Sequence, residues 1–140
     1  MSRFEDWPQR LDAAVEAART RAFAWGSFDC CLWAADVALA ITGEDPAAIY
    51  RGAYHDEAGA AALIAQHGSL AALVTALLGP PIHPAWAHRA DLVLAHLTLE
   101  GGGTGDSVGV CLGHHCAFTR RQGLVFVPRV KVSAAWKVGR

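Results

Sequence analysis

The sequence has no excess of charge of either sign, because 12 Lys and Arg residues are balanced by 13 Asp and Glu residues, a formal net charge of -1. A domain that binds DNA or RNA usually presents a basic surface, so this balance argues against a nucleic-acid partner. Long hydrophobic runs are also missing, and none approaches the roughly 20 residues that a membrane-spanning helix needs. The composition therefore predicts neither nucleic-acid binding nor membrane insertion.

The first twenty residues lack the apolar block of a signal peptide. Charged side chains interrupt this segment throughout, at Glu5, Asp6, Arg10, Asp12 and Glu16. We therefore expect the protein to be made in a reducing cytoplasm and to fold there. In that compartment cysteines are free thiols, metal ligands or nucleophiles more often than they are disulfides.

Cysteine is scarce, with four residues in the chain: Cys30, Cys31, Cys111 and Cys116. Their spacing does not match a structural zinc site, and adjacent cysteines point in different directions on a helix. The glycine run 101–103 is expected to be a flexible loop, without the flanking strand and helix of a phosphate-binding loop. We predict no metal and no cofactor. Cys111 is expected to pack beneath the helix that carries Cys30, and Cys31 and Cys116 receive no role.

The apolar content is high enough for one folded core. Hydrophobic residues make up 53% of the chain and charged residues 18%, and the mean hydropathy is +0.23. Such a chain can bury enough apolar surface to offset the entropy lost on folding, which excludes disorder as its main state. Its length, 140 residues, is that of one domain, so we predict a single domain over residues 1–140.

Helical periodicity dominates the first half of the chain, whereas short apolar segments bounded by turns dominate the second. The expected helices are residues 7–22, 30–42, 58–66 and 69–78. The expected strands are residues 91–97, 107–112, 115–119, 124–127 and 130–138, with a tight hairpin turn at Gly113. Helices followed by sequential strands predict an α+β fold in which N-terminal helices pack on one face of a C-terminal antiparallel sheet.

The segment 23–32, FAWGSFDCCL, places Cys30 at the start of a buried helix that Ser27 or Asp29 would cap and Gly43 would end. Free backbone N–H groups and the positive end of the helix dipole favour a thiolate at that position. A thiolate is the form in which cysteine acts as a nucleophile. The alternative is that the two adjacent cysteines only fill core volume, as buried cysteines often do.

Trp25-Gly26 followed by Asp29-Cys30 resembles the NlpC-type cysteine peptidases of the papain-like superfamily. Residues 91–94 are similar to the first sheet strand of that family, and residues 108–113, VGVCLG, to its second. The resemblance implies a papain-like α+β fold in which Cys30 is the nucleophile. It also implies peptidoglycan as the substrate, with Cys30 attacking a peptide amide to form an acyl-enzyme.

This sequence departs from the peptidase pattern where the family has its base. The family places a histidine directly before the Val-Gly strand, a position that is Ser107 here, and its third polar residue falls at about Thr119. A hydroxyl cannot take a proton from a thiol at neutral pH. His96 is the replacement candidate, because an antiparallel hairpin would bring it near Ser107. His115 lies roughly 16 Å along the strand from Ser107, too far to serve.

A second resemblance covers nearly the whole chain and is to an uncharacterised family encoded in tail modules of tailed phages and prophages. It rests on Trp25-Gly26, Asp29-Cys30, Ala35-Asp36, Thr42-Gly43, Asp45-Pro46, Arg51-Gly52 and Tyr54. It implies a location in the virion tail and phage tail-tip or hub proteins as partners. The polar and aromatic residues between positions 44 and 54 suggest a surface docking loop.

Two functions remain open at this point. In the first, Cys30 and His96 form a catalytic pair that cleaves peptidoglycan peptides. In the second, the same scaffold is a catalytically inactive structural or assembly module of the tail tip, as Ser107 and Thr119 favour.

Overall fold

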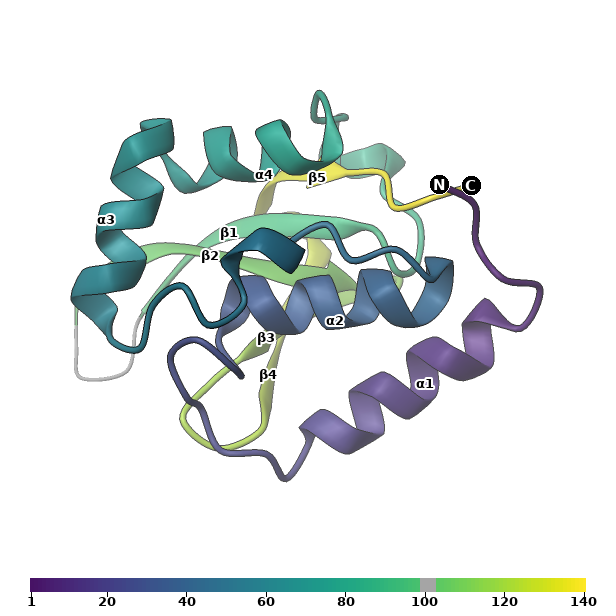
Figure 1. The fold of residues 1–140 in the computed structure, drawn as a ribbon. Helices are drawn as coiled ribbons and strands as arrows, with labels where there is room; N and C mark the ends of the chain where they lie inside the picture. The colour runs from purple at the N-terminus through teal and green to yellow at the C-terminus, as the bar shows by residue number, and fades with distance from the viewer. Residues whose placement is uncertain (99–102) are drawn as a thin grey trace.

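The computed structural model describes residues 1–98 and 103–140, which form four α-helices and a five-stranded antiparallel sheet. Figure 1 shows the helices against the sheet, with the N- and C-termini side by side. The helices are α1 (Trp7–Ala18), α2 (Cys30–Thr42), α3 (Glu57–His67) and α4 (Leu70–Leu78). The strands are β1 (Leu92–Thr98), β2 (Thr104–Cys111), β3 (His115–Thr119), β4 (Leu124–Pro128) and β5 (Val132–Trp136). Three short 3₁₀ turns are η1 (Ala48–Tyr50), η2 (Pro84–Trp86) and η3 (Arg129–Lys131).

The prediction of an α+β fold with a C-terminal antiparallel sheet is confirmed. The strand order is β4-β3-β2-β1-β5, and each neighbouring pair is antiparallel. The hairpin turn between β2 and β3 is also confirmed, with Gly113 at a φ of 111°. The glycine run expected as a loop lies mostly outside the described residues, which resume at Gly103.

The first helix ends at Ala18, four residues before the predicted end at residue 22. Beyond it the chain pairs with the turn between β3 and β4: the Arg21 carbonyl accepts from the N–H of Gly123 at 2.8 Å, and Ala22 forms a bridge with Gln122. Gly123 allows this approach, because a Cβ there would lie 2.3 Å from the carbonyl oxygen of Arg19. Pairing with distant residues therefore replaces the last helical turn.

Helix α2 runs through the centre of the molecule and has the predicted bounds at both ends. Asp29 caps its N-terminus, and Gly43 ends it in the left-handed conformation with a φ of 80°. Most of its apolar side chains pack in one buried cluster with residues of α1, α4 and the sheet, and Leu32 and Ala35 pack in a second with Tyr54 and Ala60. Burial on nearly all sides fixes the position of Cys30, the first residue of the helix.

The two faces of the sheet carry separate buried clusters, as strand alternation requires. On β1, Leu92 and Leu94 pack with the helices, whereas Val93 and Ala95 belong to the second cluster. Cys111 also lies in the second cluster, so the expectation that it packs beneath α2 is wrong. Side chains alternate along β2, so Cys111 points to the face opposite to that of Val108 and Val110, which face α2.

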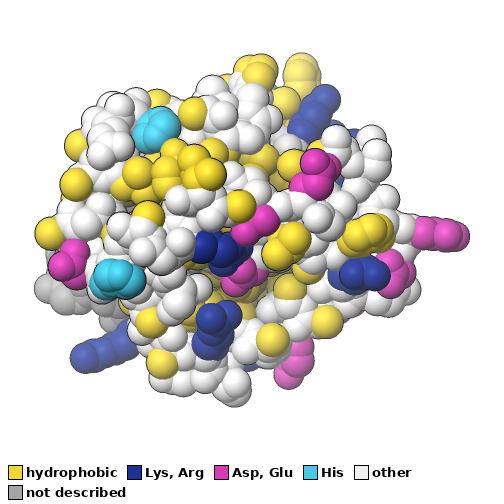
Figure 2. All heavy atoms as spheres, in the orientation of Figure 1, with side chains coloured by type: hydrophobic (Ala, Val, Ile, Leu, Met, Phe, Trp, Pro, Cys, Tyr) yellow, Lys and Arg dark blue, Asp and Glu magenta, His cyan; other side chains and the backbone are white. Residues whose placement is uncertain are grey.

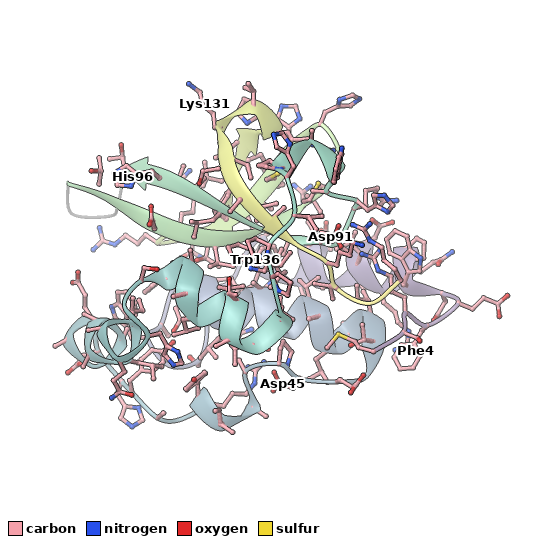
Figure 3. All side chains as sticks on the ribbon, turned by 90° about the horizontal axis from the view of Figure 1, so that it is seen from above. Phe4, Asp45, Asp91, His96, Lys131 and Trp136 are labelled. Atoms are coloured by element: carbon pink, nitrogen blue, oxygen red, sulfur yellow. The ribbon has the colours of Figure 1, made fainter. Side chains whose placement is uncertain are left out.

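The two ends of the chain meet at one buried carboxylate, that of Asp91. It accepts hydrogen bonds from the backbone N–H groups of His88 at 2.8 Å and Val138 at 3.1 Å. The guanidinium of Arg3 donates to it at 3.0 Å, and that of Arg140 also binds it. Figure 3 shows Asp91 at this end of the sheet, on the side opposite to His96.

Across residues 1–98 and 103–140, no single helix has the length and apolar character needed to cross a bilayer. Helices α3 and α4 meet these criteria only as a pair, and the pair is bent by 68°.

Candidate functional site

Cys30 opens α2 as predicted, and the residue that fixes its position is Asp29. The Asp29 side chain is 1% exposed, and its Oδ1 accepts from the backbone N–H of Leu32 at 3.0 Å. Its Oδ2 accepts from the N–H of Gly26 at 3.0 Å, which fixes the preceding turn. The cap therefore holds the first turn of α2 against the aromatic loop that precedes it, with Cys30 partly exposed.

The surroundings of Cys30 favour its ionised form. The Cys31 thiol lies 3.9 Å from the Cys30 sulfur and can donate to it. This contact lowers the pKa of Cys30, and a hydrogen bond from the backbone of Val108 also lowers it, against the opposing effects of burial and of the Asp29 carboxylate. The pKa of Cys31 is raised well above its ordinary value by the same contact and by burial. Of the two adjacent cysteines, Cys30 is the one whose ionised form is favoured.

Cys30 and Cys31 line a groove of about 820 Å³. Most of its wall is apolar and comes from α3, α4 and the buried side of α2, including Leu63, Leu73 and Leu77. Figure 2 shows hydrophobic side chains gathered in the hollow beside α4 on this face. The volume lies in the range of sites that hold a small molecule or a short peptide segment.

The ends of β2 and β3 close the groove near Cys30. Ser107 and Thr119, at the positions where the peptidases have their base and third polar residue, both line it. The hydroxyl oxygen of Thr119 is buried and has no hydrogen-bond partner among the described residues. The sheet margin predicted to face Cys30 is therefore present, and the Thr119 hydroxyl rather than an imidazole lies there. Ser107 pairs with Ala95 and has the parity of Cys111, so its side chain belongs to the face opposite to α2.

His96 lies outside this groove. Its ring bonds to the Asp106 carboxylate through Nδ1 at 3.0 Å and to the Thr104 hydroxyl through Nε2 at 3.0 Å, and its side chain is 63% exposed. In the sheet register His96 faces Asp106, whereas Ser107 faces Ala95. Figure 3 shows His96 at the end of the sheet away from Asp91. Asp106 lines the groove and His96 does not, so the structure does not bring the predicted base to the Cys30 sulfur.

None of the seven histidines of the chain, all of which lie within the described residues, lines the groove. The residues described also contain no group of three or more His, Cys, Asp or Glu side chains that could hold a metal ion. The groove therefore combines a thiol whose ionised form is favoured with an apolar wall, the Thr119 side chain and the carboxylates of Glu57 and Asp106, without an imidazole beside them.

The segment read as a docking loop is a strap, residues 44–54, that folds over α2. Tyr54 is buried and donates its hydroxyl to Asp29 Oδ2 at 2.6 Å. Arg51 bonds to Asp36 on α2 at 2.8 Å and to Asp45 within the strap at 2.6 Å. The strap supplies part of the groove wall through Ala47, Tyr50 and Tyr54, while Ile49 is 75% exposed, so the interpretation of this segment as a surface docking loop stays a prediction.

The sequence analysis missed two features of this site. One is the Asp29–Tyr54 hydrogen bond. Both residues belong to the sequence pattern shared with the phage tail-module family, so that pattern could have pointed to a contact between them. Burial and the Asp29 carboxylate raise the pKa of Tyr54, so this tyrosine remains a hydrogen-bond donor. The other is the backbone of Val108, which no side-chain pattern could reveal.

Alkylation of the folded protein by iodoacetamide at neutral pH is expected to modify Cys30 before Cys31. A lowered pKa increases the thiolate fraction, so the rate for Cys30 should reach half its maximum below the value of about 8.5 for a free cysteine. Peptide mapping by mass spectrometry at a series of pH values measures both rates. The His96→Ala variant should give the same profile, and an upward shift of its midpoint would show that His96 acts on Cys30 after all.

The comparisons with known proteins yield one family. No curated protein and no solved structure matches the chain. A family model described as a domain of unknown function, DUF6950, matches residues 2–138, which include both cysteines of the groove, the strap and the whole sheet. The chain therefore belongs to the DUF6950 family.

Proposed function

We propose that this protein is a phage tail-tip module with a papain-like, NlpC-type scaffold that has lost peptidase activity and serves in assembly. The observation that carries the proposal is the lining of the groove: Cys30 is accompanied there by Ser107 and Thr119, and by no histidine of the chain. A cysteine at the first turn of a buried helix, opposite an antiparallel sheet, supports the peptidase-like scaffold. The location in the tail and the tail partners rest on the resemblance of the sequence, with synthesis in the host cytoplasm.

The chemistry of amide cleavage explains why this lining matters. A preformed thiolate can attack a carbonyl, but the amine that leaves must then receive a proton. A serine or threonine hydroxyl is too weak an acid to donate it at neutral pH. General acid–base groups typically contribute factors of about 10² to 10⁴ in rate, so hydrolysis in this groove would be slow.

Binding is the task that the groove suits better. Its apolar wall can take hydrophobic side chains of a partner. The Asp29–Tyr54 and Arg51–Asp36 contacts keep the strap in place before binding. We therefore assign the groove to a segment of a neighbouring tail-tip or hub protein.

The competing function is cleavage of peptidoglycan peptide crosslinks, which the lowered pKa of Cys30 favours. In that case the pair of His96 and Asp106, joined at 3.0 Å, would have to approach the groove to supply the proton. Asp106 already lines the groove, so it is His96 that would have to approach Cys30.

Incubation with purified peptidoglycan distinguishes the two functions. We expect wild-type protein and the Cys30→Ala variant to release no new amine and no crosslink fragments, as measured by chromatography and mass spectrometry of the soluble products. Fragments released by the wild type and absent with Cys30→Ala would establish the peptidase instead.

Particle assembly is the second arm of the test. A phage that encodes the Cys30→Ala variant should give infective particles at the wild-type level, whereas deletion of the gene should abolish them. If deletion leaves tail assembly intact, the protein is not an assembly module and the proposal fails.

A further inference from the structure

The turn between β2 and β3 brings two buried cysteines opposite each other, and the candidate function uses neither of them. Gly113 and His114 form the turn, which is closed by a hydrogen bond from the N–H of Leu112 to the carbonyl of His115 at 2.8 Å. A glycine with positive φ at the first central position is typical of tight hairpin turns. The next pair along the ladder is Cys111 with Cys116.

This pair occupies a non-hydrogen-bonded site of the ladder. Hydrogen-bonded and non-hydrogen-bonded pairs alternate in an antiparallel ladder, and Leu112 with His115 is a hydrogen-bonded pair. In agreement, the N–H of Cys111 is directed to the other neighbour of β2, where it donates to the Asp91 carbonyl at 2.9 Å. The Cα atoms of a non-hydrogen-bonded pair are about 4.5 Å apart, inside the range of about 4.4 to 6.8 Å found for disulfides.

The two side chains also lie on the same face of the sheet. Cys111 and Cys116 are both fully buried and belong to the same apolar cluster, on the face opposite to α2. Their thiols are hydrogen-bonded to each other, which lowers the pKa of Cys111 and raises that of Cys116. One thiol is thus predisposed to form the thiolate that disulfide exchange requires.

We propose that Cys111 and Cys116 form a reversible cross-strand disulfide when the chain meets an oxidising thiol–disulfide pool. The Cys111 thiolate attacks one sulfur of an oxidised low-molecular-weight disulfide, such as oxidised glutathione, and expels one reduced thiol. The Cys116 sulfur then displaces the second thiol, so the protein loses two electrons and two protons and the oxidant becomes two thiols. The bond joins β2 and β3 at the closed end of the hairpin.

Cys30 and Cys31 provide a matched control within the same chain. Their sulfurs are 3.9 Å apart, but the residues are adjacent, and consecutive Cα atoms joined by a trans peptide are about 3.8 Å apart. This separation lies below the range of disulfides, and a bond would distort the first turn of α2. An oxidant should therefore link Cys111 to Cys116 and leave Cys30 and Cys31 reduced or singly modified.

The test uses the full chain in glutathione redox buffers, approached from two directions: the native reduced protein, and protein unfolded and refolded in the same buffer. After trapping with N-ethylmaleimide, peptide mapping should find the Cys111–Cys116 link at least about tenfold more abundant than a Cys30–Cys31 link. The refolded sample gives the equilibrium result even if burial slows oxidation of the native protein. Failure to find the link in that sample overturns the proposal, as does a dominant Cys30–Cys31 link.

A variant separates the bond from other effects of oxidation. Wild-type protein should melt at a higher temperature in its oxidised form than in its reduced form, whereas Cys116→Ala should melt at the same temperature in both buffers. A difference of equal size in the variant would show that another oxidation causes the shift. Cys30→Ala should keep the full wild-type difference, and the result does not depend on whether the protein acts in a phage tail.

Discussion

Replacing Asp91 by alanine is expected to lower the free energy of unfolding by about 3–5 kcal/mol. The carboxylate is fully buried and binds the guanidinium groups of Arg3 and Arg140 as well as two backbone N–H groups. Alanine would leave the buried Arg3 charge without its counterion, where burial already lowers its pKa. A loss of this size is a large part of the roughly 5–15 kcal/mol that stabilise a typical domain.

Urea unfolding followed by circular dichroism measures this loss, and Asp12→Ala is the control. Asp12 also bonds to an arginine, Arg89, at 3.4 Å, but its side chain is 75% exposed. Exposed ion pairs contribute about 0–1 kcal/mol, so the control should stay within about 1 kcal/mol of wild type. Equal losses in the two variants would mean that burial of Asp91 does not determine its contribution.

Asp29 is the residue for which a structural and an electrostatic role can be separated. Asp29→Ala should lower the free energy of unfolding by about 2–4 kcal/mol, because it removes the cap of α2 and leaves the buried Tyr54 hydroxyl unpaired. Asp29→Asn keeps one oxygen that can cap the helix, but its amide NH2 would face the Gly26 N–H, so it should cost less than alanine without reaching wild-type stability. It also removes the negative charge that raises the pKa of Cys30, so that pKa should fall.

The two Asp29 variants are compared by urea unfolding and by the pH dependence of Cys30 alkylation. We expect Asp29→Asn to lose less stability than Asp29→Ala and to shift the alkylation midpoint to lower pH. A shift to higher pH in Asp29→Asn would mean that the helix cap controls the thiol more strongly than the charge does. Asp29→Ala serves to show how much of the stability depends on the contact with the strap.

Local signals predicted the elements whose ends are set by nearby residues. Both ends of α2 were predictable, because Asp29 bonds within its first turn and Gly43 follows its last residue. The end of α1 was not, because residues near position 121 determine it, about a hundred positions further along the chain. The side of the sheet on which Cys111 packs depended in the same way on a register that no local pattern specifies.

In the candidate site, too, the features set by neighbouring residues were predictable and those set by distant residues were not. The position of Cys30 follows from its neighbours in sequence, and it was predicted correctly. The placement of His96 was an inference from strand pairing alone, and pairing brings Cα atoms together without directing side chains to one place. In the structure the ring bonds to the carboxylate opposite it and stays outside the groove. Contacts made by the backbone, such as that of Val108 with Cys30, do not depend on the side chain and therefore cannot be predicted from the residue type.

Asp91 gives the two chain ends a shared anchor, and this makes them interdependent. Terminal segments usually fray independently, because each is held only by its own contacts. Here, detaching Arg3 also removes the hydrogen bond of 2.8 Å from its Nε to the carbonyl of Val138, whose own N–H binds Asp91. Amide hydrogen exchange should therefore speed up near residue 138 when the first residues are trimmed, although more than 130 positions of sequence separate the two segments.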